Sequence, residues 1–250
     1  MWQHWLWHTK KQTVSAVTPL TGLTACSQRV DTISGQRYVL RSQTPRATDF
    51  GINYQQEALF LKQLAPLNLA PELYYHDHQY CLLGWIEGTT PSAFTPQLLE
   101  QLATKLAQLH QFSLNNFPAQ HSLHLNLADR CQFLWDKLPA EKQKTLGFAP
   151  PFQTITPLRE ALCHHDIHLA NLVLCENQLY LIDWEYAAIS DIALELAMLR
   201  HSQIFNETQW ACFLEHYITK IGLDLPACTQ KIAEYLPEVA KLSQLWYALR

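Results

Sequence analysis

The sequence predicts an α+β fold in two lobes, with a small antiparallel sheet first and a mainly helical part after it. In residues 14–41, the alternation of residue types and the intervening turn residues indicate three strands. A helical stretch and a second pair of strands follow, and beyond residue 95 the apolar residues recur mainly at helical spacing. Strands that precede a run of helices are typical of α+β proteins. With 250 residues and 48% hydrophobic content, the chain is long enough to bury cores of this size.

The first lobe is predicted over residues 1–86. Its first strands include a hairpin turn at residues 34–36, and a second strand pair is expected at 72–77 and 80–85. Between them we expect a helix from about Asp49 to Leu64, ended by Pro66. One face of this helix carries residues at three- and four-residue spacing, namely Tyr54, Glu57, Ala58, Leu61 and Leu64. A carboxylate on an apolar stripe is costly to bury unless it is paired, so Glu57 predicts a cationic partner.

The second lobe is predicted over residues 96–250, after a hinge at 87–95. Thr95 is expected to cap a helix that begins at Pro96. Its buried stripe consists of Leu99, Leu102, Leu106 and Leu109. Residues 113–160 predict only mixed helix and loop. Further on, Ser190 or Asp191 is expected to cap a helix that runs to about His201, and two more helices are expected within 207–250.

Composition excludes several classes of protein. The formal net charge of -4 gives no basic field of the kind that binds nucleic acid. Residues 1–11 lack the basic start and apolar core of a secretory signal, and no run of 18 apolar residues predicts a membrane helix. The seven cysteines are odd in number and form no Cys-x-x-Cys pair. We therefore expect a cytoplasmic protein with free thiols and neither nucleic-acid nor membrane partners.

The most informative segment is residues 163–187. It places Asp166, Asn171 and Asp183 in the order and spacing that phosphoryl transfer needs. Two apolar runs, 172–174 and 179–182, read as short strands joined by a turn, so that Asn171 stands at the entry of a hairpin and Asp183 at its exit. We expect the Asp166 carboxylate to accept the proton of an alcohol, and Asn171 and Asp183 to share one metal ion.

This segment resembles the aminoglycoside phosphotransferase and choline kinase superfamily. His164, Asp166 and Asn171 match its His-x-Asp-x-x-x-x-Asn loop, and residues 182–185 match its Ile-Asp-Trp/Phe-Glu motif. The resemblance implies a two-lobed protein-kinase-like fold and the phosphorylation of a small alcohol with ATP and Mg²⁺. Two positions depart from the family pattern: His165 stands where the family often has Gly, and Glu195, read as a structural brace, where it commonly has Asp.

The histidines of this segment allow a different interpretation. His164, His165 and His168, together with Asp166, could form a zinc site, since His is the commonest protein ligand for zinc. The spacing argues against zinc, because a zincin helix needs Glu beside the first His of its i, i+4 pair, where this chain has His165. His164 is instead expected to pack under the catalytic loop.

On the nucleotide side, the resemblance implies a cation on the third strand that pairs with a carboxylate on the next helix. Arg41 and Glu57 are the candidates, the alternative being a solvated strand end and a stray charge. The loop at 21–30 is expected over the phosphates. It contains one glycine, Gly22, with the hydroxyls of Thr24 and Ser27 as substitutes for a glycine-rich cradle. The hinge residues expected at adenine include Leu83 and Trp85.

The alcohol is the least constrained part of this reading. Residues 181–187 and 191–197 resemble the bacterial thiamine kinases, which implies thiamine, and choline or ethanolamine is the alternative. Both thiamine and choline are cations and favour carboxylates and aromatic faces. The expected substrate contacts are Glu185, Trp184 and His168, with Tyr186, Trp246 and Tyr247 as further aromatic candidates. A catalytically inactive kinase-like protein that binds nucleotide or a partner protein is the rival of a different class.

Overall fold

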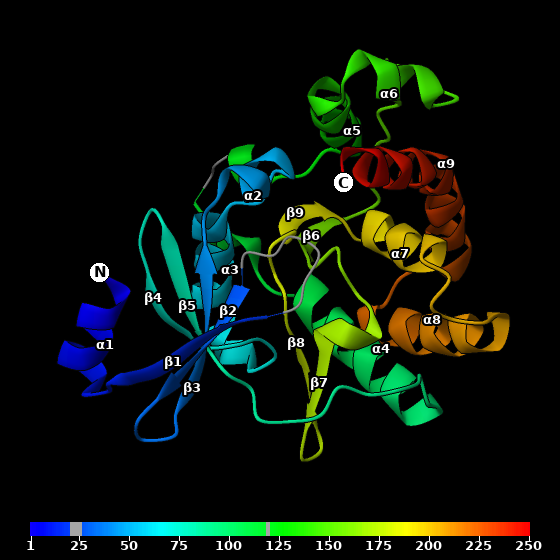
Figure 1. The fold of residues 1–250 in the computed structure, drawn as a ribbon. Coiled ribbons are helices and arrows are strands. Elements are labelled where there is room, and N and C mark those ends of the chain that lie inside the picture. The colour runs from blue at the N-terminus through cyan, green and yellow to red at the C-terminus, as the bar shows by residue number, and fades with distance from the viewer. Residues whose placement is uncertain (21–26, 119–120) are drawn as a thin grey trace. The chain divides into compact units, whose positions relative to one another are not determined.

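The computed structural model describes residues 1–20, 27–118 and 121–250 (Figure 1). The chain divides into two compact units. The first contains Met1–Thr89 and Val173–Glu185, and the second contains Thr90–Leu172 and Tyr186–Arg250. Among the described residues, no helix combines the length and hydropathy needed to cross a membrane.

The first unit is built on a five-stranded antiparallel sheet with the strand order β1-β2-β3-β5-β4. Its strands are β1 (Val14–Pro19), β2 (Ser27–Thr32), β3 (Arg37–Ser42), β4 (Leu73–His76) and β5 (Tyr80–Gly84). Gly35 adopts a left-handed φ of 85° in the turn between β2 and β3, a conformation that glycine takes without steric cost. The strands predicted from the sequence are thus all present.

Three helices accompany this sheet: α1 (Trp2–Lys10), α2 (Pro45–Asp49) and α3 (Tyr54–Leu64), with a 3₁₀ turn, η1 (Ala65–Leu67), after α3. The sequence places the start of α3 at about Asp49, which is wrong, because Gly51 breaks the chain at a φ of 67° and Asn53 caps the helix. The Asn53 side chain accepts from the Gln55 and Gln56 N–H groups. Helix α1, which the sequence does not predict, buries Trp2 and Leu6 against the sheet.

A two-stranded hairpin, β7 (Leu172–Cys175) and β8 (Gln178–Leu181), carries the second half of the motif. Its backbone is bonded to the first unit: the Leu181 N–H donates to the Leu69 carbonyl, and Thr89 and Leu174 exchange two bonds of 2.9 Å. The predicted division at 1–86, 87–95 and 96–250 assigns this hairpin to the second lobe. The contacts of residues 173–185 instead lie in the first unit.

The second unit is mainly helical. Its helices are α4 (Pro96–His110), α5 (Leu127–Lys137), α6 (Ala140–Thr145), α7 (Ile192–His201), α8 (Glu207–Ile221) and α9 (Leu225–Leu249). Its other elements are the 3₁₀ turns η2 (Leu114–Asn116), η3 (His121–Leu123) and η4 (Leu169–Asn171) and a two-stranded sheet of β6 (Glu160–Cys163) and β9 (Ala188–Asp191). Helices α4 and α8 lie side by side (Figure 1), and α9 packs against α5 and α7.

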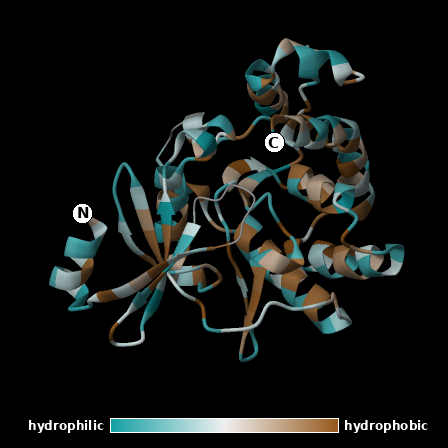
Figure 2. Ribbon diagram, in the orientation of Figure 1, coloured by the Kyte–Doolittle hydropathy of each residue, from teal (hydrophilic) through white to brown (hydrophobic). Residues whose placement is uncertain are grey.

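Burial follows from the apolar stripes of these elements. Figure 2 shows hydrophobic residues along α4 and along β7, whereas α6 is mostly hydrophilic. The predicted stripe of α4 is buried, and the Thr95 hydroxyl accepts from the Leu98 N–H at 3.2 Å as its cap. Asp191, rather than Ser190, caps α7. The sheet-then-helices order predicted from the sequence is therefore the order of the structure.

Candidate active site

In the second unit, the catalytic loop follows β6 and ends in the 3₁₀ turn η4. The Asn171 Nδ2 group donates two hydrogen bonds of 2.9 Å, one to the Asp166 carbonyl and one to Asp166 Oδ2. His168 Nε2 lies 3.6 Å from the same carboxylate. Burial disfavours the charged form of Asp166, but His168 and Asn171 hold its pKa below the ordinary value. Asp166 is therefore an ionised acceptor in a closed loop.

The buried carboxylate of Glu195 binds the backbone of this loop. Glu195 Oε1, from α7, accepts the N–H groups of His164 and His165 at 2.7 Å each, and Glu195 Oε2 lies 2.5 Å from His110 Nε2 on α4. The other His110 nitrogen is 2.7 Å from the Tyr217 hydroxyl on α8. Burial alone would raise the pKa of Glu195, but His110 and the loop histidine lower it to about 2. Glu195 is thus the brace that the sequence predicts.

The brace supports a strained turn of the backbone. His165 has a left-handed φ of 66°, a region that non-glycine residues rarely occupy. Its Nε2 lies 2.7 Å from the Ser190 hydroxyl on β9, and burial lowers its pKa to about 4. The imidazole is therefore neutral near pH 7. The two N–H bonds to Glu195 fix the loop in this left-handed conformation.

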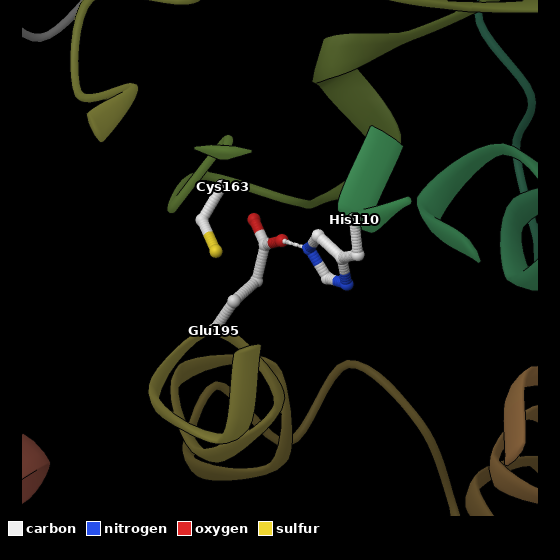
Figure 3. A group of neighbouring side chains, drawn as sticks. All are labelled: His110, Cys163 and Glu195. Carbon is white, nitrogen blue, oxygen red and sulfur yellow. Dashed lines mark hydrogen bonds and ion pairs between the residues drawn. The ribbon is translucent and has the colours of Figure 1, made fainter. Parts of the chain in front are cut away.

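The brace also forms a cluster of potential metal-ligand types. Figure 3 shows His110, Cys163 and Glu195 pointing toward one another, with their ligand atoms within 4.8 Å. Glu195 already accepts backbone N–H groups and the His110 ring. Burial, followed by the Glu195 charge, raises the pKa of the Cys163 thiol well above its usual value, which opposes the thiolate that zinc requires. We interpret this cluster as a structural support.

His164 and His165 each use a ring nitrogen in a hydrogen bond that supports the loop. His164 Nδ1 accepts the Asp166 N–H at 3.2 Å, and His165 Nε2 is bonded to Ser190. One ring nitrogen of each residue is therefore engaged, although His165 Nδ1 is buried without a hydrogen-bond partner among the described residues, and these bonds disfavour the zinc interpretation. His164 is completely buried, in agreement with its predicted role under the loop.

In the first unit, Arg41 on β3 is surrounded by three carboxylates. Its Nε lies 3.3 Å from Glu57 on α3, its Nη1 donates to Glu185 at 3.0 Å, and its Nη2 donates to Asp183 at 2.7 Å. The Tyr54 hydroxyl adds a bond of 3.3 Å to Glu185. Burial raises the pKa of Glu57 to about 7, against the opposing charge of Arg41. The structure thus brings together the predicted pair of Arg41 and Glu57.

The other predicted nucleotide contacts lie in or beside the sheet. Leu83 is buried in β5, and the Arg37 guanidinium lies 5.4 Å from the Trp85 ring centroid. Ser27 is the first residue of β2. Gly22 and Thr24 lie outside the described residues. Contact of these residues with a nucleotide remains a prediction.

Two of the expected substrate contacts are located away from any free surface. Trp184 is fully buried, with its Nε1 donating to the Leu181 carbonyl at 2.8 Å. Glu185 is buried under Arg41. Both follow the left-handed residue Asp183, whose φ is 67°, and they anchor it. We therefore assign these two side chains to the support of Asp183 rather than to the substrate.

Several participating residues are missed by sequence reasoning. Tyr54 is recognised only as part of an apolar stripe, and the pairing of His110 with Tyr217 joins helices that are far apart in the sequence. In the second unit, Trp246 Nε1 also donates to the Tyr186 hydroxyl at 3.2 Å.

The catalytic loop and the hairpin each offer an oxygen atom that is suited to a magnesium ion. Both hydrogen bonds of the Asn171 amide group come from its nitrogen, which leaves its oxygen as the atom suited to a cation. The Asp183 side chain is 34% exposed and offers a carboxylate. Oxygen atoms of this kind are the ligands that Mg²⁺ prefers. Asn171 belongs to the second unit and Asp183 to the first, so their sharing of one ion remains a prediction.

Comparison with known proteins gives a consistent family. The model of the phosphotransferase enzyme family matches residues 27–230. A thiamine kinase of Salmonella typhimurium is 31% identical over 197 residues, which is 76% of this chain and 67% of that protein. A thiamine kinase of Escherichia coli is 27% identical over 223 residues, which is 86% of this chain and 76% of that protein.

Solved structures show the same fold. The choline kinase LicA from Streptococcus pneumoniae has a TM-score of 0.70 at 21% identity, covering 94% of this chain and 85% of that one. The structure of LicA in complex with AMP has a TM-score of 0.71 at 20% identity, covering 99% of this chain and 88% of that one. A macrolide 2'-phosphotransferase type I gives 0.65 at 19% identity, with 98% and 88% covered. The fold is the two-lobed kinase-like fold that the sequence predicts.

Proposed function

Because this chain belongs to the phosphotransferase enzyme family, we propose that it uses ATP and Mg²⁺ to phosphorylate the hydroxyl of thiamine, giving thiamine phosphate. The observation that carries the proposal is the clamp between Asn171 and Asp166. This clamp presents an ionised carboxylate in a loop of fixed shape, which an alcohol substrate requires for orientation and loss of its proton.

In this proposal Asp166 is the catalytic base. Its carboxylate accepts the hydrogen bond of the substrate hydroxyl and takes up the proton as the oxygen attacks the γ-phosphorus of ATP. The bond from that phosphorus to the oxygen bridging to the β-phosphate breaks, and ADP leaves. The brace of Glu195 on the loop backbone holds Asp166 in position, since the N–H groups of the two preceding residues are bonded to it. Because its pKa is lowered, Asp166 is ionised near neutral pH, so its carboxylate is free of a proton before the alcohol binds.

The nucleotide belongs to the first unit in this proposal. Arg41 and Glu57 align the phosphates, with Ser27, Leu83 and Trp85 around the nucleotide. Asn171 and Asp183 would hold Mg²⁺, which when bound neutralises charge on the transferred phosphoryl group. The complex of LicA with AMP, at 20% identity, supports nucleotide use through the shared fold only.

The choice of thiamine is supported by the relatives. The 31% identical protein from Salmonella typhimurium is named a thiamine kinase. In the second unit, His168 beside Asp166 and the bonded pair of Tyr186 and Trp246 are the side chains that we assign to the acceptor side. An aromatic face binds a flat heteroaromatic cation with about 0.5 to 2 kcal/mol, and this contribution alone does not separate thiamine from choline.

A competition experiment tests the substrate. Thiamine and choline at equal concentration are incubated with ATP, Mg²⁺ and the protein, and both phosphorylated products are quantified by mass spectrometry. We expect kcat/KM for thiamine to exceed that for choline at least roughly tenfold. Protein groups that bind the pyrimidine ring of thiamine would be left unpaired when choline binds, which costs about 1 to 3 kcal/mol. Equal or reversed values would point to a choline or ethanolamine kinase. No product from either alcohol, with ATP binding intact, would point to an inactive kinase-like binding protein.

A further inference from the structure

Each of the three nitrogens of the Arg41 guanidinium lies within 3.3 Å of a carboxylate oxygen, and Nη1 and Nη2 make hydrogen bonds. Nη1 and Nη2 donate to Glu185 and Asp183 at 3.0 and 2.7 Å, and Nε lies 3.3 Å from Glu57. An arginine that served only to bind phosphate would be expected to keep some of its guanidinium N–H groups free for the phosphate. Here each nitrogen faces an acid, so Arg41 is first of all the counter-ion of these residues.

The three carboxylates differ in their access to solvent. The side chain of Asp183 is 34% exposed, whereas those of Glu57 and Glu185 are 0% and 4% exposed. A cation that comes from solution can therefore reach Asp183 most readily. It meets there an oxygen that already accepts from Arg41 at 2.7 Å.

The support around Arg41 keeps it at this position. The Tyr54 hydroxyl on α3 donates to Glu185, and the centroid of the Tyr54 ring lies 5.6 Å from the guanidinium carbon of Arg41. Glu57 lies on the same helix as Tyr54. Arginine keeps its charge at every physiological pH. A divalent ion at Asp183 must therefore approach a fixed positive charge.

We propose that Arg41 acts as a resident counter-ion that prevents Asp183 from taking up a divalent cation until nucleotide is bound. Nucleotide phosphates can accept the N–H groups of Arg41 and bring negative charge of their own, so Asp183 becomes available as the metal arrives with the nucleotide. The inference rests on the proposed function, in which Asp183 is a metal ligand. It adds an order of binding and gives Arg41 a positioning role apart from phosphate contact.

The test measures divalent-cation binding without nucleotide. Mn²⁺ is titrated into the nucleotide-free protein, and the free ion is followed by its electron paramagnetic resonance signal. We expect weak binding in the wild type and at least about tenfold tighter binding in Arg41→Met, since a unit charge roughly 5 Å from a divalent ion has an effect of this size even at the dielectric constant of water. Arg46→Met, at an exposed arginine of α2, is the matched control and should bind Mn²⁺ as the wild type does.

A second pair of variants excludes a folding artefact. Arg41→Met leaves buried carboxylates without their counter-ion, which can unfold the protein. Arg41→Met/Glu57→Gln removes one of these charges, and it should still show the gain in Mn²⁺ affinity. Adding Asp183→Asn to that double variant should abolish the gain. Unchanged or weaker Mn²⁺ binding in the folded double variant would overturn the inference.

The outcomes separate this inference from the proposed function. Turnover of thiamine with Mg²⁺ and ATP is measured on the same wild-type preparation. Absence of turnover with thiamine and with choline counts against the proposed function, whatever the Mn²⁺ affinities are. Normal turnover combined with an unchanged Mn²⁺ affinity in the Arg41 variants counts against the counter-ion role alone.

Discussion

Glu195→Gln should destabilise the protein at neutral pH by removing the charge of the loop brace while keeping its size. The amide oxygen of Gln can still accept the N–H groups of His164 and His165, so the main loss is electrostatic. The pKa of Glu195 falls from 4.5 to about 2 in the folded protein. At about 1.4 kcal/mol per unit, this difference corresponds to about 3 kcal/mol of stability.

The sign of the pH dependence follows from the lowered pKa. The contribution of Glu195 is fully present above pH 4.5 and is lost as the pH falls toward about 2. Urea unfolding of the wild type and of Glu195→Gln, followed by circular dichroism, should therefore give a large difference in unfolding free energy at pH 7. The difference should shrink at pH values below 4.5.

Glu215→Gln, an exposed substitution on α8, is the matched control and should change the unfolding free energy by less than about 0.5 kcal/mol. The reasoning is refuted if Glu195→Gln is as stable as the wild type at pH 7. It is also refuted if the difference between the two proteins is the same at pH 7 and at pH 3, because the lowered pKa requires it to change.

Three further predictions concern the first unit and the helical support. Arg41→Lys and Glu57→Gln should each raise the KM for ATP. A double-mutant cycle should show losses that are less than additive, because the two residues share an ion pair. Additive losses would show that they act independently. Gly88→Ala should lower the melting temperature measured by calorimetry, since the added Cβ would lie 2.5 Å from the Leu174 carbonyl oxygen. This overlap should destabilise the protein by about 1 to 3 kcal/mol. An unchanged melting temperature would contradict that contact. Tyr217→Phe should cost about 1 to 3 kcal/mol in urea unfolding by leaving the imidazole nitrogen of α4 unsatisfied, and a neutral effect would show that this bond contributes nothing.

The local features of the site could be predicted from the sequence. The spacing of polar residues around two apolar runs predicts Asp166, Asn171 and Asp183 as site residues, and the structure shows the Asn171 side chain bonded to Asp166. The cost of burying a carboxylate predicts the partner of Glu57, and the structure shows Arg41 at 3.3 Å. These inferences depend on neighbours in sequence or on a single energetic rule.

The remaining features depend on long-range packing, which periodicity does not encode. Glu185 is 144 residues from Arg41 in sequence, and nothing in the local pattern of either residue identifies them as partners. The motif alone suggests a substrate contact for Glu185. Similarly, the hairpin follows the catalytic loop in sequence, yet it packs with the first unit because its backbone bonds to Leu69 and Thr89.

The most direct test of the proposed function is the transfer of the γ-phosphoryl group of labelled ATP to thiamine, measured side by side for the wild type and for Asp166→Asn. The wild type should form labelled thiamine phosphate. Asp166→Asn should lower kcat by about 10² to 10⁴, with the affinity for ATP little changed, because its amide cannot take up the proton of the alcohol. Near wild-type turnover in Asp166→Asn, or label released only as inorganic phosphate by the wild type, would contradict the proposed function.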